Sequence, residues 1–105
     1  MTLLIFLRVL PINSFGKNAP KLSEAIQQYL QLRGVGKAKT FHRAASRSVS
    51  AVVDVCGDKA CSDYRTTDAG RVRDILLDSG LNASSVRRMF NTIKAIFNLA
   101  IAEHR

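Results

Sequence analysis

The stretch of the chain that most restricts its fold is residues 82–103, NASSVRRMFNTIKAIFNLAIAE. Its large apolar side chains recur at spacings of three and four residues, which is the pattern of one buried face of an α-helix about five turns long. The residues on this face are Val86, Met89, Phe90, Ile93, Ile96, Phe97, Ala100 and Ile101. Because so long an apolar stripe must be covered, we expect the rest of the chain to supply elements that pack against it.

The other side of the same helix is polar and basic. A helix start of this composition offers backbone N–H groups, the positive end of the helix dipole and guanidinium groups, all of which suit phosphates and base edges. The alternative is an ordinary solvated surface. The residues concerned are Ser84, Ser85, Arg87, Arg88, Asn91 and Lys94, with Asn82 as the expected N-cap.

Three further amphipathic helices are predicted at residues 22–32, 38–55 and 67–79. Glycines at 34, 36 and 80 follow the first and third of them, as at many helix ends. Four helices with short connections favour an all-α fold, a small four-helix bundle. The expected inward-facing residues of the second and third helices are Phe41, Ala45, Val49, Val52, Val53 and Cys56, then Val72, Ile75 and Leu76.

Local signals mark the ends of these helices and the connection between the second and the third. Ser23 is the expected N-cap of the first helix, and Thr66 or Thr67 that of the third. Asp68 falls in the first turn of the third helix, where the dipole favours an acid. Tyr64, in the preceding connection, is expected to anchor that loop to the core.

The second predicted helix carries its own cationic stripe. Lys39, Arg43 and Arg47 are four residues apart and therefore share a face with Ser46 and Ser50. Like charges at this spacing cost a few tenths of a kcal/mol each, so a helix that tolerates them commonly meets an anion. Lys37 and His42 lie close by, and for His42 taken alone an exposed or capping role is favoured over that of a ligand or a base.

The size and the net charge of the chain also favour one small domain with an anionic partner. A chain of 105 residues with 47% hydrophobic residues can build one domain with one modest core. Its formal charge of +8 favours polyanionic partners such as nucleic acid or an anionic membrane. Cys56 and Cys61 form no CxxC pair and have no histidine at ligand spacing, so we expect two reduced thiols, as in a cytoplasmic protein, and neither a metal nor another cofactor.

The beginning of the chain is a separate feature. Residues 2–12, TLLIFLRVLPI, are apolar but are interrupted by Arg8 and ended by Pro11, and they are too short to span a bilayer. We expect a short extended segment that packs on the core or joins a second copy in a homodimer. Residues 13–20 have the composition of a linker, which divides the chain into residues 1–20 and a helical domain over residues 21–105.

The order and character of these helices resemble a known family. Residues 22–103, from LSEAIQQYL through GDKACSDYRTTDAGRVRDILLDSGL to NASSVRRMFNTIKAIFNLAIAE, resemble the core-binding domain of tyrosine recombinases, the phage integrase family of bacteria and their phages. The last segment carries most of the resemblance: a small polar cluster, then Val-Arg-Arg, then Ile-Lys-Ala-Ile-Phe-Asn-Leu-Ala. The resemblance implies a helical domain of SAM-like type.

The resemblance also implies a function. In that family this domain and a catalytic domain close around double-stranded DNA, with helices corresponding to the second and fourth helices here against the major groove. Carried onto this chain, the DNA contacts would be Lys37, Lys39, His42, Arg43, Arg47, Ser84, Ser85, Arg87, Arg88, Asn91 and Lys94.

The sequence departs from the family in lacking the catalytic domain. Strand cutting in the family uses a tyrosine with arginines and histidines of that domain, and neither Tyr29 nor Tyr64 has such residues around it in sequence. We therefore expect no catalytic residues and no enzymatic activity in this chain, whose partner would be the catalytic domain of the same parent protein.

Two other functions fit the same residues. RDILLDSGLNASSVRRMF, with Gly80 in the turn, is similar to the helix-turn-helix of bacterial repressors, although the apolar stripe continues to Ile101, beyond the usual length of a recognition helix. The chain also fits a helical protein-interaction module whose charge serves solubility or an acidic partner. An enzyme is the least supported class, since the sequence has no phosphate loop and no nucleophile beside a base.

Overall fold

A computed structural model describes residues 19–104, and the predictions for the extended segment and the dimer contact at residues 2–12 lie outside these residues. The described chain forms four α-helices: α2 (Leu22–Arg33), α3 (Lys39–Cys56), α4 (Thr66–Asp78) and α5 (Ala83–His104). A short 3-10 helix, η1 (Cys61–Asp63), lies between α3 and α4. Each helix begins and ends within one residue of its predicted bounds, and the predicted all-α bundle is confirmed.

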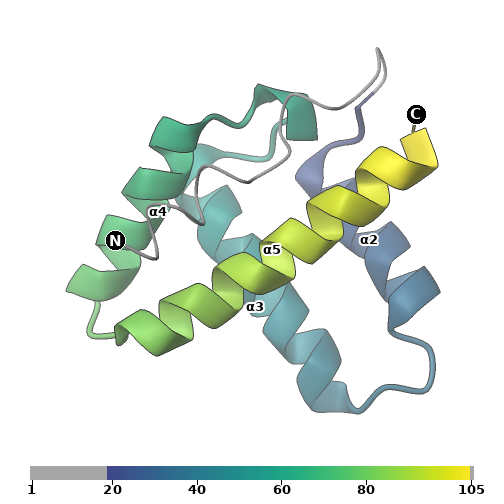
Figure 1. Cartoon of the computed structure of the whole chain (residues 1–105), viewed down its shortest axis with the longest axis horizontal. Coiled ribbons are helices and arrows are strands. Elements are labelled where there is room, and N and C mark those ends of the chain that lie inside the picture. The colour runs from purple at the N-terminus through teal and green to yellow at the C-terminus, as the bar shows by residue number, and fades with distance from the viewer. Residues whose placement is uncertain (1–18, 105) are drawn as a thin grey trace.

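The long helix α5 organises the bundle. It crosses α3 as the two arms of an X, with α4 and α2 on either side (Figure 1), and it packs against all three other α-helices. Seven of the eight residues predicted on its apolar face are buried, whereas Met89 is half-buried. Phe90, Ile96 and Val86 are at most 2% exposed, so the apolar stripe of α5 forms the centre of the core.

The inward faces of α3 and α4 largely match the sequence pattern. Ala45, Val49 and Val52 are buried, and the remaining predicted α3 residues are partly buried against the core. On α4, Val72 is buried, but the prediction for Ile75 was wrong, because its side chain is 46% exposed. Ile75 lines a shallow groove between α3, α4 and the start of α5 together with Leu76, which is partly buried against the core, so Ile75 lies at the edge of the packed side of α4.

Two predicted N-caps were also wrong. Helix α2 already begins at Leu22, so Ser23 lies within its first turn, and the Ser23 hydroxyl instead donates a hydrogen bond of 2.6 Å to Asp58 Oδ2. Helix α4 follows Arg65, whose backbone N–H donates to Asp68 Oδ2 at 3.0 Å, so neither threonine is the cap. The predicted cap of α5 is confirmed, since the Ser85 N–H donates to Asn82 Oδ1 at 2.8 Å.

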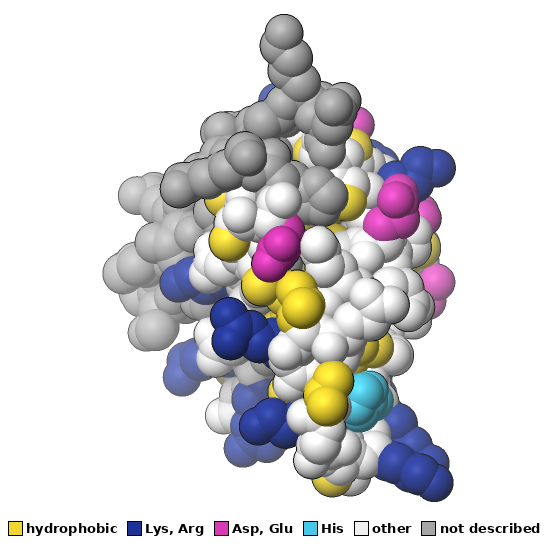
Figure 2. All heavy atoms as spheres, turned by 90° about the vertical axis from the view of Figure 1, so that its right-hand side faces the viewer, with side chains coloured by type: hydrophobic (Ala, Val, Ile, Leu, Met, Phe, Trp, Pro, Cys, Tyr) yellow, Lys and Arg dark blue, Asp and Glu magenta, His cyan; other side chains and the backbone are white. Residues whose placement is uncertain are grey.

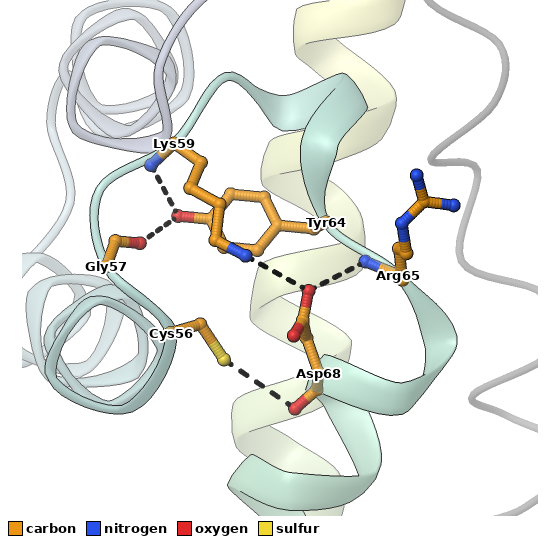
Figure 3. A network of polar contacts seen from close by, with 6 residues as sticks. All are labelled: Cys56, Gly57, Lys59, Tyr64, Arg65 and Asp68. Atoms are coloured by element: carbon orange, nitrogen blue, oxygen red, sulfur yellow. Dashed lines mark hydrogen bonds and ion pairs between the residues drawn. The ribbon is translucent and has the colours of Figure 1, made fainter.

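The connection between α3 and α4 is held by Tyr64, as predicted (Figure 3). The buried phenol donates to the Gly57 carbonyl at 2.7 Å and accepts from the Lys59 N–H at 3.1 Å. Burial raises the pKa of Tyr64 to about 12, so the phenol stays protonated at neutral pH. The Lys59 ammonium lies 3.4 Å from Asp68 Oδ2 and thereby links this loop to the first turn of α4.

Both cysteines are free thiols. Cys61 is fully buried, and burial raises its pKa to about 12, which makes it unreactive as a nucleophile. Cys56 is half-buried, and its Sγ lies 3.8 Å from the Asp68 carbonyl oxygen. Burial is the first cause that raises the pKa of Cys56, and the nearby Asp68 carboxylate adds to it.

Candidate nucleic-acid interface

Positive and negative residues are separated along the chain. Residues 25–53 and 79–102 contain no Asp or Glu, and between them they carry Arg33, Lys37, Lys39, Arg43, Arg47, Arg87, Arg88 and Lys94. The acids Asp54, Asp58, Asp63, Asp68, Asp74 and Asp78 all belong to residues 54–78. Because the first two stretches supply most of α2, nearly all of α3 and nearly all of α5, the excess positive charge falls on these three helices and the acids gather on and before α4.

The surface reflects this separation. Figure 2 shows one side of the molecule, where most Lys and Arg side chains gather over the lower half, whereas Asp and Glu side chains lie over the upper and middle parts with a basic side chain beside them at the upper right. The lower part of the fold contains the turn between α2 and α3 and the start of α3 (Figure 1). A surface divided in this way attracts a polyanion to one end of the molecule.

The two predicted cationic stripes meet in one groove. Arg47 of α3 and Arg88 of α5 both line a depression of about 270 Å³ beside the crossing of the two helices. The rest of its lining consists of Ala44, Ser48, Leu81, Ser85, Met89 and Thr92, with no acidic residue among them. Two exposed guanidinium groups at the edges of a shallow groove can hold an oxyanion through paired N–H donors.

The hydroxyl groups of this groove are partly committed to the fold. Ser48 is buried and donates to the Ala44 carbonyl at 2.9 Å, and Thr92 donates to the Arg88 carbonyl at 3.2 Å. Ser85 is half-buried on the first turn of α5, where the helix dipole adds positive potential. The two arginines are therefore the groups of the groove that remain able to contact an anion.

The remaining predicted residues of α5 lie around its outer side. Ser84, Arg87 and Asn91 are exposed, and Lys94 is half-buried further along the helix. On the helical wheel Arg87 and Asn91 point away from the side of α5 that lines the groove with Arg47. The structure therefore brings Arg88 together with Arg47, but it places Arg87 and Asn91 on another side of α5, outside the groove.

The residues predicted at the start of α3 separate into two groups. Lys39 and Arg43 are exposed on the outer side of the helix. Lys37 instead lines a second, larger depression, together with the end of α2 and the second half of α5.

His42 has a structural role in this fold. Its Nε2 lies 2.9 Å from the Gly34 carbonyl oxygen, so with Nε2 protonated the ring donates to the turn that follows α2. The ring also meets Phe41 edge-on, at 5.9 Å between centroids. The capping role that the sequence left open for His42 is the one that its contacts support.

The second depression contains residues that the sequence interpretation missed. Its volume is about 500 Å³, and it is lined by Tyr29, Arg33, Lys37, Phe41, Ala95, Asn98, Leu99 and Ala102. Arg33 is not among the predicted DNA contacts, which come only from Lys37 and from the second and fourth predicted helices. Its position in the last turn of α2, only four residues before Lys37, was the available signal.

The described residues offer little for other kinds of site. Within residues 19–104, no three His, Cys, Asp or Glu side chains are grouped so that they could hold a metal ion. In the same part of the chain, no helix has the length and apolar content needed to cross a bilayer.

Comparison with protein-family models, with curated proteins and with solved structures finds no match to this chain.

Proposed function

We propose that this chain binds double-stranded DNA through the cationic face of α3 and the first half of α5. The observation that carries the proposal is the groove in which Arg47 and Arg88 meet, since these residues lie 41 positions apart in the sequence and each belongs to a stripe of positive charge. Guanidinium groups from two crossing helices can contact phosphates of one strand, while exposed residues beside them reach into the major groove. Because most of the acidic residues belong to residues 54–78, they leave the excess positive charge to α3 and α5, which supports the face of these two helices as the DNA-binding one.

Within this proposal, the chain serves as the DNA-clamping part of a phage-integrase-like site-specific recombinase. The resemblance of residues 22–103 to the core-binding domain of that family supports this assignment, as does the all-α bundle built around a long last helix. Cutting and rejoining of strands would belong to the catalytic domain of the parent protein. This chain would position the DNA and would not react with it.

Substitution of the groove arginines tests the proposal. We expect Arg47→Ala and Arg88→Ala each to weaken binding to duplex DNA and to reduce the dependence of log K on log salt by about one, as for the loss of one phosphate contact. If either arginine reads a base edge, its loss costs about 1–3 kcal/mol on the preferred sequence and less on others. Fluorescence anisotropy with labelled duplexes measures both quantities.

Arg71→Ala is the matched control, because Arg71 is an exposed arginine of α4 among the acids. This substitution removes the same charge from the molecule but leaves the groove intact, so the affinity of the variant for DNA should change little. Equal losses for all three variants would indicate that only net charge matters and would contradict the proposed face.

A further inference from the structure

The depression between α2, α3 and α5 combines aromatic rings with positive charge. Phe41 stacks on Tyr29 with ring centroids 5.8 Å apart and an angle of 22° between the rings. Tyr29 is almost fully buried, whereas Phe41 is only partly buried and lines the opening. The Lys37 ammonium lies over the Phe41 ring at 5.9 Å from its centroid, and Arg33 stands on the same wall.

These contacts define the chemistry of a fitting ligand. A planar ring can stack on Phe41 in place of the Lys37 ammonium, which belongs to an exposed, long side chain and can move onto an adjacent anion. Asn98, at the rim, offers an amide that can donate to and accept from a ring edge. A flat ring attached to a phosphate is a nucleotide, and bases stacked on aromatic side chains beside cations are the usual means of binding single strands.

We propose that this depression takes an unpaired nucleotide from a DNA strand whose duplex part occupies the groove of Arg47 and Arg88. The inference rests on the proposed function, because both depressions flank the crossing of α3 and α5 and share these two helices. Phe41 and Arg47 are six residues apart on α3, which is about 9 Å along the helix. Their side chains also lie about 120° apart around the helix, so at roughly 3.4 Å per nucleotide a strand must extend about three or more nucleotides from a duplex end at Arg47 to reach Phe41.

An acidic peptide is the competing occupant, since the floor of the depression includes the apolar side chains of Ala95, Leu99 and Ala102. The stacked rings favour the nucleotide, because a peptide carboxylate needs the cations but gains nothing from a ring face. The nucleotide is also favoured because this depression shares α3 and α5 with the groove of Arg47 and Arg88, where the duplex would bind.

The test compares three DNA probes bound to the full chain. One is a blunt duplex, the second is the same duplex with a short oligothymidine extension, and the third is a longer blunt duplex with the same number of phosphates as the second. We expect the extension to tighten binding about five-fold or more over the phosphate-matched duplex. A 2-aminopurine at the first unpaired positions should lose fluorescence on binding, as a stacked base does.

Phe41→Leu should abolish both the gain from the extension and the fluorescence loss, while blunt duplex affinity stays unchanged. Phe41→Tyr retains a ring face and should retain the gain, which separates loss of stacking from loss of folding. Arg88→Ala should weaken all three probes together.

Three results would overturn the inference. In the first, the extension does not increase the affinity over that of the phosphate-matched duplex. In the second, the extension increases the affinity, but Phe41→Leu leaves this increase intact. The third is an acidic helical peptide that displaces the oligothymidine extension from the wild-type chain and that, like the extension, binds the Phe41→Leu variant poorly.

If blunt duplex is bound and the extension adds nothing, the proposed nucleotide pocket is wrong and the duplex proposal stands. If oligothymidine binds through Phe41 but blunt duplex does not, the duplex proposal fails instead.

Discussion

At the scale of single residues, Tyr64 shows how a polar group can be buried with its hydrogen bonds satisfied. Its phenol oxygen makes two hydrogen bonds within the loop between α3 and α4, while its ring lies 6.0 Å from that of Phe97, measured between centroids. The hydroxyl thus fixes the loop and the ring fixes the loop to α5. This arrangement positions the start of α4 and leaves the phenol no role on the surface.

The first prediction concerns that hydroxyl. Tyr64→Phe leaves the Lys59 N–H and the Gly57 carbonyl without their partner, so we expect the free energy of unfolding to fall by about 1–3 kcal/mol. Tyr29→Phe is the control, because no hydrogen bond of the Tyr29 hydroxyl is found within residues 19–104. Urea denaturation of both variants measures the difference, and equal stabilities would contradict the role of Tyr64.

The second prediction concerns Asp68. Burial opposes its charged form, but the hydrogen bond from the Arg65 N–H and the Lys59 ammonium outweigh it and hold the pKa of Asp68 below its ordinary value of 3.8. A carboxyl whose pKa is lowered by folding stabilises the protein above its unfolded pKa and loses this effect as the pH falls through its folded pKa. The contribution should therefore be complete above about pH 5 and decline below about pH 4.

Asp68→Asn should cost about 0.5–1 kcal/mol at neutral pH, since it removes the charge from the first turn of α4. It should also make stability less dependent on pH between about 6 and 3, although part of the dependence remains because hydrogen bonds from Ser23 lower the pKa of Asp58. Urea denaturation across this pH range provides the measurement. An acid dependence as steep as that of the wild type would show that Asp68 does not carry it.

At the scale of elements, two glycines have opposite effects on the stability of the fold. Gly70 lies inside α4, and the nearest side-chain atom that a Cβ there would meet within the described residues 19–104 is Arg73 Nη2 at 3.9 Å. Gly34 ends α2, and a Cβ there would lie 2.6 Å from the Leu30 carbonyl oxygen and 2.8 Å from His42 Cε1. The first glycine weakens its helix, whereas the second permits the close approach of His42.

The third prediction follows from this contrast. Gly70→Ala should stabilise the fold by about 0.5–1 kcal/mol, because alanine loses less backbone entropy in a helix. Gly34→Ala should destabilise it by about 1–3 kcal/mol, because the new methyl group forces the turn and the His42 ring apart. Thermal denaturation measures both changes, and a shift of the same sign for the two variants would contradict this account.

The elements also show what sequence patterns can and cannot predict. The apolar stripe of α5 was predictable because helical periodicity depends only on residues a few positions apart. The caps of α2 and α4 were not, because the Ser23 hydroxyl bonds Asp58, 35 positions away, and Arg65 caps through its backbone rather than its side chain. Ile75 shares the apolar period of α4, but it lies at the edge of a groove lined by α3 and α5, and within residues 19–104 its side chain stays 46% exposed.

At the scale of the whole molecule, function depends on how the helices cross. Each cationic stripe was visible in the sequence, but spacing along one helix says nothing about its angle to another. The crossing of α3 and α5 brings Arg47 and Arg88 to one groove, and the packing of the end of α2 and the turn after it brings Arg33 and Lys37 to a second depression with Phe41. The acids are confined largely to residues 54–78, so the groove of Arg47 and Arg88 has no acidic residue in its lining, and Asp54, near the end of α3, lies in the adjoining groove.

The salt dependence of binding to duplex DNA tests the central claim most directly. If the face of α3 and α5 neutralises about four to six phosphates, log K should fall linearly with log salt at a slope of roughly −4 to −5. The wild-type chain should show this slope with duplexes of any sequence, since phosphate contacts are independent of the bases. A slope near zero, or no binding at low salt, would contradict the account that this molecule binds double-stranded DNA.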